Sequence, residues 1–256
     1  PEIPQNFPFM TAKNIVSTST GIDFTIEANC DKSNQKESEK ILFDDSNKKV
    51  SFEVKANLPG AFNAYNLMAS IMAVSSVTNL SFEEVAKKCA NLLPIKGRMT
   101  VIDEGQPFEV IVDYAHTPSS FEAIFPPIRK RCKGRMFALF GSGGERDLTK
   151  RPLQGQIAAK YCDFVFLADE DPRGENPEEL LNMIAEGAVK EGKVLNKDLF
   201  VIPDRPKAIR KVFSMAQKDD IVLLLGKAHE NSIIYKDFVM PYDEISEAKK
   251  AIKEML

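Results

Sequence analysis

The sequence predicts an α/β protein whose C-terminal part folds as a Rossmann-like, doubly wound and mostly parallel sheet. Residues 137–173 carry the main evidence, because an apolar run, a glycine-rich turn, a segment of helical spacing and a second apolar run follow one another there. This order is typical of a β-α-β unit. The alternation of strand and helix continues to residue 225, which favours a parallel sheet with right-handed crossovers.

The composition indicates a globular protein. A chain of 256 residues with 43% hydrophobic residues can bury the core of one large domain or of two smaller ones. The net charge of −3 comes from well-mixed charges that form no basic stripe for nucleic acid, and no apolar run is long enough to cross a bilayer. We therefore expect a monomer that binds neither nucleic acid nor a membrane.

The cysteines and the N-terminus favour a cytoplasmic location. Cys30, Cys89, Cys132 and Cys162 lack Cys-x-x-Cys spacing, and cysteines scattered in this way fit reduced thiols better than a disulfide framework or a zinc site. The first residues show neither a basic stretch followed by an apolar core nor a small-residue cleavage site. Nothing in the sequence therefore marks the chain for export.

The N-terminal part predicts short strands followed by two helices. Alternating apolar and polar residues predict strands at 15–19, 22–28, 41–43 and 50–54, and a polar loop is expected at 31–40. Residues 63–77 are apolar nearly all round, which predicts a buried helix. Ser81 and Glu84 have the spacing of a capping box and begin a second helix, which is expected to end near residue 93.

A domain boundary is predicted at residues 94–99, where proline and glycine interrupt the helical pattern. It divides the chain into residues 1–96 and 97–256. Beyond it, the patterns predict strands at 100–104, 109–113, 137–140, 164–168, 199–202, 221–225 and 233–240, and helices at 119–130, 152–161, 178–190, 205–217 and 244–256. Open α/β sheets bind ligands at the carboxyl ends of their strands, so the loops there are the candidate site.

Six short motifs occur in a fixed order along the chain. They are Gly60-Ala61-Phe62-Asn63-Ala64-Tyr65-Asn66, Gly97-Arg98-Met99, Asp113-Tyr114-Ala115-His116-Thr117-Pro118, Gly141-Ser142-Gly143-Gly144-Glu145-Arg146-Asp147 with Lys150-Arg151-Pro152, Asp171-Pro172-Arg173 and Gly226-Lys227-Ala228-His229-Glu230. Taken singly, each fits an ordinary turn or loop, and the glycine spacing matches neither a Walker phosphate loop nor a Gly-x-Gly-x-x-Gly fingerprint. Together, they resemble the Mur ligase family from about residue 50 onward.

The resemblance is strongest to the branch of this family that adds the third residue of the peptidoglycan stem peptide. It implies that residues 1–96 are the end of an α/β central ATPase domain and that residues 97–256 are the C-terminal domain. In the implied reaction, ATP phosphorylates the carboxylate of a UDP-N-acetylmuramoyl-dipeptide, and a free amino acid then attacks the acyl phosphate. Magnesium offsets the charge of the transferred phosphoryl group.

Five residues are implied at the ATP: Asn63, Asn66, Arg98, Asp113 and His116. Asn63 and Asn66 share one face of a helix, Arg98 reaches the nucleotide from the predicted hinge, and Asp113 and His116 follow a buried strand. Three of them have a plainer alternative, since Asn63 can cap its helix, Arg98 can be an ordinary linker residue and His116 can be structural.

A second set of residues suits an amino acid. Arg146, Asp171, Arg173 and Glu230 combine fixed cations with carboxylates, and such a set fits a zwitterion because arginine pairs with carboxylate and carboxylate receives ammonium. The resemblance implies that Arg146, Arg173, Gly226 and Glu230 hold the incoming amino acid. It places Arg173 on the distal carboxylate of meso-diaminopimelate, which favours this substrate over L-lysine.

The sequence departs from the family pattern at two positions. Asp171 stands where the family has asparagine, so a group that donates and accepts becomes an acceptor. Ala228 stands where the family has glycine, and its methyl group restricts the loop if that position needs positive φ. His229 and Glu230 do not form a zinc motif, because Ile233 occupies the place of a second histidine.

The parts of the ligase that perform the phosphorylation belong before residue 1 by this comparison. They comprise the phosphate loop, the UDP-binding domain, the metal-binding residues and a carbamylated lysine, so the chain is expected to be inactive without an N-terminal half. Two alternatives remain open. One is a free-standing module that binds an amino acid or a nucleotide, and the other is a glutamate-adding ligase of the folate or cyanophycin type.

Overall fold

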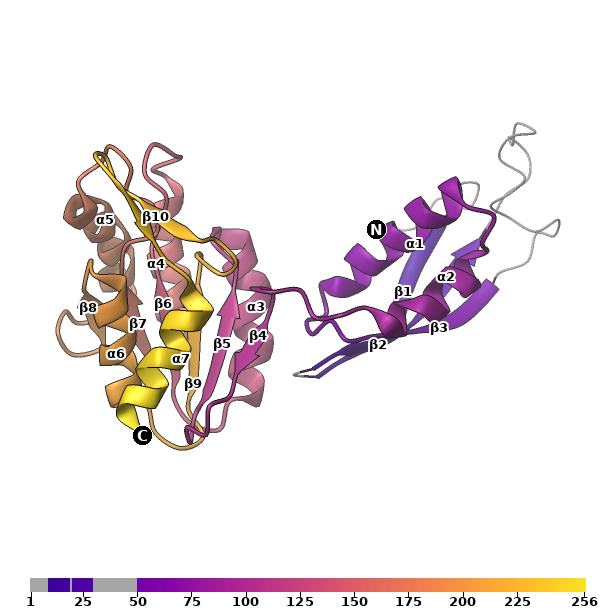
Figure 1. Cartoon of the computed structure of the whole chain (residues 1–256), viewed down its shortest axis with the longest axis horizontal. Helices are drawn as coiled ribbons and strands as arrows, with labels where there is room; N and C mark the ends of the chain where they lie inside the picture. Colours follow the sequence, from indigo (N-terminus) through magenta and orange to yellow (C-terminus); the bar gives the residue numbers. More distant parts are fainter. Residues whose placement is uncertain (1–8, 19, 30–49) are drawn as a thin grey trace. The chain divides into compact units, whose positions relative to one another are not determined.

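The structure is a computed structural model that describes residues 9–18, 20–29 and 50–256. The strand predicted at 41–43, the polar loop predicted at 31–40 and Cys30 lie outside the described residues. The chain divides into two compact units, Pro1–Ile95 and Lys96–Leu256 (Figure 1). No helix in the described part of the chain is both long enough and apolar enough to span a membrane.

In its described residues, the first unit contains an antiparallel sheet of three strands. They are β1 (Phe9–Ser17), β2 (Ile22–Asn29) and β3 (Val50–Ala56), in the order β1-β2-β3. Ile22, Phe24 and Ile26 are buried and alternate with more exposed residues, because successive side chains of a strand point to opposite faces. One face of the sheet therefore carries the core of this unit.

Helix α1 (Asn63–Val77) packs one stripe of its side chains on this core. The helix α2 (Phe82–Lys88) and the 3₁₀ helix η2 (Cys89–Asn91) follow. The prediction that residues 63–77 are buried nearly all round is wrong, since Val77 is 82% exposed and Tyr65 and Met72 are also exposed. A helix turns its side chains through 3.6 residues per turn, so a single sheet covers only one stripe. The predicted capping box of Ser81 and Glu84 is confirmed.

The second unit, residues 96–256, is described throughout and contains a six-stranded sheet in the order β4-β5-β9-β6-β7-β8. Its strands are β4 (Thr100–Ile102), β5 (Glu109–Asp113), β6 (Met136–Phe140), β7 (Phe164–Leu167), β8 (Leu199–Val201) and β9 (Ile221–Leu225). Only β4 runs antiparallel to its neighbour, and the other pairs are parallel. The predicted α/β class and the mostly parallel sheet are confirmed.

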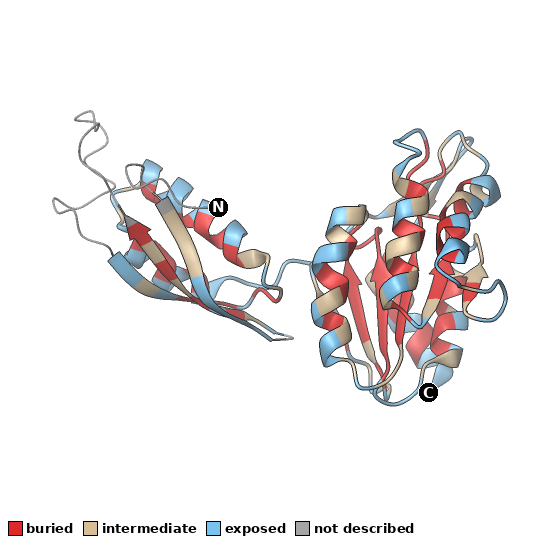
Figure 2. Ribbon diagram, turned by 180° about the vertical axis from the view of Figure 1, so that it is seen from behind, coloured by how far each residue is buried: buried red, intermediate tan, exposed pale blue. Residues whose placement is uncertain are grey.

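Helices cover both faces of this sheet. They are α3 (Pro118–Arg131), α4 (Lys150–Tyr161) and α5 (Pro177–Lys190) on one face, and α6 (Arg205–Met215) and α7 (Glu244–Met255) on the other. The chain crosses from β5 to β6, β7 and β8 in one direction and returns to β9, so right-handed crossovers place α6 opposite α3–α5. Figure 2 shows the strands of this sheet buried beneath their helices.

The segment predicted as one closing strand at 233–240 is instead a β-hairpin. Its strands are β10 (Ser232–Ile234) and β11 (Val239–Pro241), which pair antiparallel. The turn is closed by Tyr235 N, which donates to the carbonyl oxygen of Phe238 over 3.0 Å, and the two rings stack with centroids 4.6 Å apart. The polar Lys236 and Asp237 occupy the turn, which explains the break in a run that is otherwise apolar.

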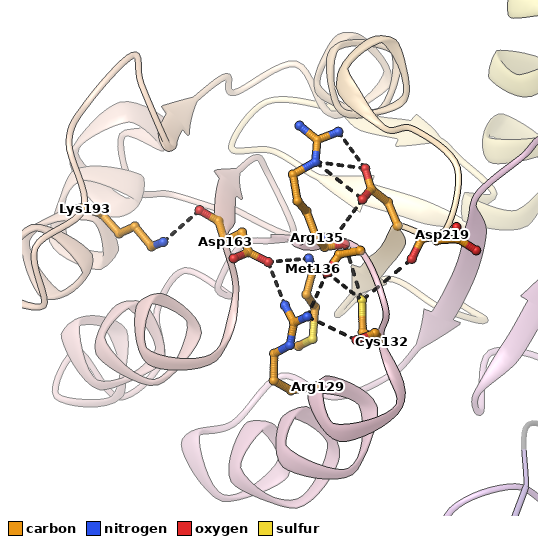
Figure 3. A network of polar contacts seen from close by, with 9 residues as sticks. Arg129, Cys132, Arg135, Met136, Asp163, Lys193 and Asp219 are labelled. Atoms are coloured by element: carbon orange, nitrogen blue, oxygen red, sulfur yellow. Dashed lines mark hydrogen bonds and ion pairs between the residues drawn. The ribbon is translucent and has the colours of Figure 1, made fainter.

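Ion pairs hold together the amino end of the sheet (Figure 3). The Asp163 carboxylate accepts hydrogen bonds from Met136 N and from Arg129 Nη1, both over 2.7 Å, and Lys193 Nζ donates to the Asp163 carbonyl oxygen over 2.8 Å. These contacts join the end of α3 to the starts of β6 and β7. This edge is therefore occupied by structural pairs, and the candidate loops lie at the opposite edge.

Candidate functional site

The loops that follow β5, β6, β7 and β9 meet at the carboxyl edge of the sheet. Gly144 N donates to the Asp171 carbonyl oxygen over 2.8 Å, which joins the loop after β6 to the loop after β7. Lys227, after β9, pairs with the Asp171 carboxylate, and the Tyr114 hydroxyl, after β5, donates to Glu230. The chain leaves β9 toward one face and leaves β5 and β6 toward the other, so this is a topological switch point, where such sheets bind ligands.

A buried ammonium group organises the centre of this edge. The Lys227 side chain is only 1% exposed, and its Nζ lies 2.8 Å from Asp171 Oδ1 and 2.6 Å from Glu230 Oε2. The amide of Ile234 also donates to Asp171 Oδ1 over 2.9 Å. A buried charge is stable only when it is paired, so one cation fixes two carboxylates that come from different loops.

Arg173 stands beside this cluster in a strained backbone conformation. Its φ is +54°, and its amide donates to the Ile234 carbonyl oxygen over 2.9 Å. Its Nη2 lies 3.9 Å from Asp171 Oδ2, and the side chain is 30% exposed. The buried Nε has no hydrogen-bond partner in the described residues. A guanidinium group carries five N–H donors, so Arg173 keeps donors for a carboxylate ligand.

Gly226 is required by its own conformation and by its neighbour Glu170. Its φ is +96°, and a Cβ added there would lie 2.6 Å from Glu170 Oε2. That oxygen is buried and has no hydrogen-bond partner among the described residues. Desolvation raises the pKa of Glu170, and the charges of Arg205 and His116 act against this rise. The loop thus places an unpartnered carboxylate against a residue that has no side chain.

Arg146 is the predicted amino-acid residue that the structure does not bring into the cluster. It is exposed, and its Nη1 donates to the Glu145 carbonyl oxygen over 3.3 Å. Among the contacts of the described residues, none joins Arg146 to Asp171, Arg173 or Glu230. Its place at the amino acid remains a prediction.

Two of the predicted ATP residues lie at the end of β5 and in the segment before β4. The Arg98 guanidinium carbon lies 5.0 Å from the centre of the Tyr114 ring. The Asp113 carboxylate accepts from Met99 N and from Ala115 N, both over 2.8 Å. Burial raises the pKa of Asp113, and these amide donors oppose the rise. Asp113 therefore anchors the hinge segment to the sheet, in addition to any contact with a nucleotide.

The other three predicted ATP residues have local partners. His116 Nδ1 lies 2.8 Å from the Tyr114 carbonyl oxygen. In the first unit, Asn63 Nδ2 donates to the Pro59 carbonyl oxygen over 2.8 Å, and Asn66 Nδ2 donates to Asn63 Oδ1 over 2.9 Å. No side chain caps the first turn of α1. The capping alternative for Asn63 is therefore wrong, and the roles of these residues at a nucleotide remain predictions.

Residues 97–228 match the family model described as the Mur ligase, glutamate ligase domain. The chain belongs to the Mur ligase family. The chain is 50% identical over 251 residues to the UDP-N-acetylmuramyl-tripeptide synthetase of Treponema denticola, an alignment that covers 97% of this chain and 44% of the relative. It is 35% identical over 252 residues to the UDP-N-acetylmuramoyl-L-alanyl-D-glutamate–2,6-diaminopimelate ligase of Caldanaerobacter subterraneus subsp. tengcongensis, covering 98% and 46%. The chain thus spans less than half the length of these relatives.

Solved structures agree with this assignment. A UDP-N-acetylmuramoyl-L-alanyl-D-glutamate–2,6-diaminopimelate ligase is 28% identical and superposes with a TM-score of 0.58, covering 95% of this chain and 45% of that one. The UDP-N-acetylmuramate-alanine ligase of Thermotoga maritima is 15% identical, with a TM-score of 0.63 and coverage of 96% and 45%, and shares the fold. The family resemblance predicted from the motifs is confirmed.

Both departures from the expected family motifs have structural consequences. Asp171 uses Oδ1 for Lys227 and for Ile234 N, and turns Oδ2 toward Arg173. Ala228 has a φ of +38° and is fully buried. The position therefore does adopt a positive φ, and a residue with a side chain is strained there by about 1 kcal/mol or more.

Sequence analysis missed three residues that shape this site. Tyr114 lies within a recognised motif and Glu170 directly precedes one, but local spacing reveals neither the hydrogen bond of Tyr114 to Glu230 nor the position of Glu170 against Gly226. Arg151 is fully buried, and its two terminal nitrogens lie 2.7 and 2.9 Å from the two oxygens of Glu175. It also donates to the Gly143 carbonyl oxygen over 3.3 Å, so it ties the glycine-rich turn to the loop after β7.

A metal ion has no evident site in this part of the ligase. The described residues contain no group of three histidine, cysteine, aspartate or glutamate side chains that could hold a metal ion. No magnesium ligand is therefore assigned among the described residues.

Proposed function

We propose that this chain is the C-terminal part of an ATP-dependent ligase that adds meso-diaminopimelate, as the third residue, to UDP-N-acetylmuramoyl-dipeptide. Residues 1–96 would be the end of its ATP-binding central domain and residues 97–256 the domain that receives the amino acid. Its relatives are named for this peptide synthesis, and one of them is named as a diaminopimelate ligase. In this proposal the protein acts as a monomer in the cytoplasm.

The single observation that carries the proposal is the geometry of Arg173 beside Asp171, which Lys227 joins to Glu230. The far end of diaminopimelate bears both an ammonium and a carboxylate group. Arg173 offers unused donors to that carboxylate, and Asp171 Oδ2, 3.9 Å from Arg173 Nη2, offers an acceptor to that ammonium. L-lysine has an ammonium group at its far end and no carboxylate, so it would leave the unused donors of Arg173 without a ligand carboxylate. This difference supports diaminopimelate over L-lysine.

The chain's own residues would orient the amine that attacks. Glu230 is fixed through Oε2 by Lys227 and through Oε1 by Tyr114, so its carboxylate is presented in one orientation. A fixed acceptor of this kind holds the amine of the incoming amino acid and lowers the entropic barrier to its attack on an activated carboxylate. ATP, when bound, supplies that activation by phosphorylation, for which the described residues offer no phosphate loop. We therefore propose that the chain is inactive without an N-terminal half.

Calorimetric titration of the chain with meso-diaminopimelate and with L-lysine tests this proposal. We expect binding of diaminopimelate, weakened about 10- to 100-fold by Arg173→Ala because a charge-assisted hydrogen bond is lost. Arg131→Ala is the matched control, since Arg131 pairs with Glu109 at the opposite edge of the sheet and should leave the affinity unchanged. Equal affinities for both amino acids, or no effect of Arg173→Ala, would refute the assignment of diaminopimelate.

Catalysis is tested by adding an N-terminal segment of the Treponema denticola relative together with ATP, Mg²⁺ and UDP-N-acetylmuramoyl-dipeptide. Release of phosphate that requires diaminopimelate and both protein segments is expected. Phosphate release by the chain alone would contradict the proposed division of labour.

A further inference from the structure

Tyr114 lies between the two predicted subsites of the second unit. Its hydroxyl group donates to Glu230 Oε1 over 3.3 Å, on the amino-acid side. Its ring lies beneath the Arg98 guanidinium group at 5.0 Å, on the nucleotide side. The His116 and His229 rings flank it, with centroids 4.7 and 4.8 Å away. Tyr114 therefore contacts groups from the hinge segment, from the end of β5 and from the loop after β9.

The hydroxyl group has a defined task at Glu230. Lys227 occupies Oε2, and Tyr114 supplies the donor at Oε1. Burial, and after it the nearby charge of Glu230, raise the pKa of Tyr114, so the phenol keeps its proton and remains a donor at neutral pH. Without this donor, the carboxylate would be held at one oxygen only and could rotate.

The ring has a separate task at the hinge segment. A guanidinium group over an aromatic face is attracted to it, so the position of Arg98 depends on the ring. The segment is also packed closely on the loop after β9, because a Cβ at Gly97 would lie 2.7 Å from the Ala228 methyl carbon. A displacement of the hinge segment would thus reach Glu230 by way of the Tyr114 ring and hydroxyl group.

We propose that Tyr114 is a positioning residue that couples Arg98 to Glu230, and through them couples the nucleotide subsite to the amino-acid subsite. This inference rests on the proposed function. Tyr114 does not take part in bond formation. Its ring sets the place of the arginine, its hydroxyl group sets the orientation of the carboxylate, and the rigid phenol joins the two.

Two substitutions separate these tasks. Tyr114→Phe removes the hydroxyl group and keeps the ring, and Tyr114→Leu removes both. We expect Tyr114→Phe to weaken diaminopimelate binding about tenfold, the effect of one hydrogen bond to a charged group. Arg98→Ala should weaken diaminopimelate binding in the wild-type chain but have no further effect in the Tyr114→Leu chain, because the connection is already broken. Additive effects in this cycle would overturn the inference.

The assembled ligase gives a kinetic readout that a merely structural role would not produce. Tyr114→Phe should raise the KM for diaminopimelate and leave the KM for ATP unchanged, whereas Tyr114→Leu should raise both. Equal KM changes in the two variants would contradict the separate tasks of ring and hydroxyl group. Thermal unfolding of each variant establishes that it is folded. If Tyr114→Leu does not fold, the cycle is carried out with Tyr114→Phe and Arg98→Ala, because Tyr114→Phe also removes the contact with Glu230.

A ligand-free measurement distinguishes failure of this inference from failure of the proposed function. If the wild-type chain binds no diaminopimelate, the proposed function fails. The backbone amide NMR signals of residues 226–230 then test, without any ligand, whether Tyr114 couples Arg98 to this loop. Arg98→Ala should shift these signals in the chain with Tyr114 and produce no further shift beside Tyr114→Leu. Identical shifts in both backgrounds would overturn the coupling.

Discussion

The ammonium group of Lys227 lies 2.8 Å from the carboxylate of Asp171, 56 positions earlier in the chain. The pair joins the loop after β9 to the loop after β7. The Lys227 ammonium group also lies 2.6 Å from Glu230 Oε2, so the lysine and the two carboxylates form one cluster of ion pairs. The proposed amino-acid subsite and the stability of this edge of the sheet therefore depend on the same buried lysine.

Replacement of Lys227 by methionine tests that dependence. The change keeps an unbranched side chain one atom shorter but leaves Asp171 and Glu230 without their cation, so the free energy of unfolding should fall by about 3 kcal/mol. Urea unfolding measures it, with Lys218→Met as the control because Lys218 is exposed and has no ion pair among the described contacts. Equal losses in both variants would show that the buried pairing contributes nothing specific.

Replacement of Asp171 by asparagine restores the family residue and should change selectivity. The amide removes a negative charge that the distal ammonium groups of both ligands would meet, but it also leaves Arg173 free to pair with the distal carboxylate, which only meso-diaminopimelate carries. We expect the preference for meso-diaminopimelate over L-lysine to rise about fivefold, equivalent to about 1 kcal/mol. Calorimetry with both ligands measures the ratio. A ratio that falls would mean that Asp171 contributes more to diaminopimelate than to L-lysine.

Gly226 and Gly192 form a matched pair for a steric test. Both have positive φ, at +96° and +94°, but a Cβ at Gly226 would meet Glu170 Oε2 at 2.6 Å, whereas a Cβ at Gly192 meets nothing within 4 Å. Gly192→Ala should cost about 1–2 kcal/mol from backbone strain alone. Gly226→Ala should cost about 1–3 kcal/mol more from crowding.

Chemical denaturation of the two alanine variants gives the difference. Adding Glu170→Ala to Gly226→Ala should recover most of the extra loss, because it removes the crowded carboxylate. Absence of any recovery would show that Glu170 is not the group that excludes a side chain at Gly226.

Asp169 makes the stability of the fold depend on pH. It is 4% exposed, burial raises its pKa to about 6, and the Tyr235 hydroxyl and Arg205 act against that rise. The native state therefore binds a proton that the unfolded chain, with an ordinary pKa of 3.8, has lost between about pH 4 and 6. Stability from this group is present at pH 3 and is lost as the pH rises through that window.

Replacement of Asp169 by asparagine should remove the loss of stability at rising pH, because asparagine carries no charge. Its amide oxygen still accepts the hydrogen bond from the Tyr235 hydroxyl group. At pH 7 the variant should be more stable by at most about 3 kcal/mol, and at pH 3 it should match the wild type. Unfolding curves from pH 3 to 7 check this, with Asp237→Asn in the exposed turn as the control. An asparagine variant whose stability changes with pH as the wild type does would rule out Asp169 as the source.

The sequence predicts the class of the fold well because apolar runs directly report buried strands. The strands 109–113, 137–140, 164–168 and 221–225 are recovered almost to the residue. Hydrophobic pattern does not report which neighbour covers a given face. For this reason α1 was predicted to be buried although one side of it is exposed, and the turn from Tyr235 to Phe238 was predicted to be part of a strand.

The site is recovered less completely, for a related reason. Motifs identify Asp171, Arg173 and Glu230 by residue type, but the contacts that orient them are made across the sheet. Lys227 and Asp171, for example, pair over 2.8 Å although 56 positions separate them. Pairings of this range follow from the order of the strands, which local spacing does not determine.

The order of strands in the second unit also has a consequence for how the molecule is assembled. β9 is the last strand of the six-stranded sheet in the chain, yet it lies between β5 and β6, which pair with it on either side. During synthesis from the N-terminus, β5 and β6 do not pair with each other. Each of them gains its neighbour on this side only when residues 221–225 have been made. Contacts that span more than a hundred residues make folding slow. The loop that begins at Gly226 follows that central strand, so a nascent chain forms the edge proposed to bind the amino acid only as the sheet is completed.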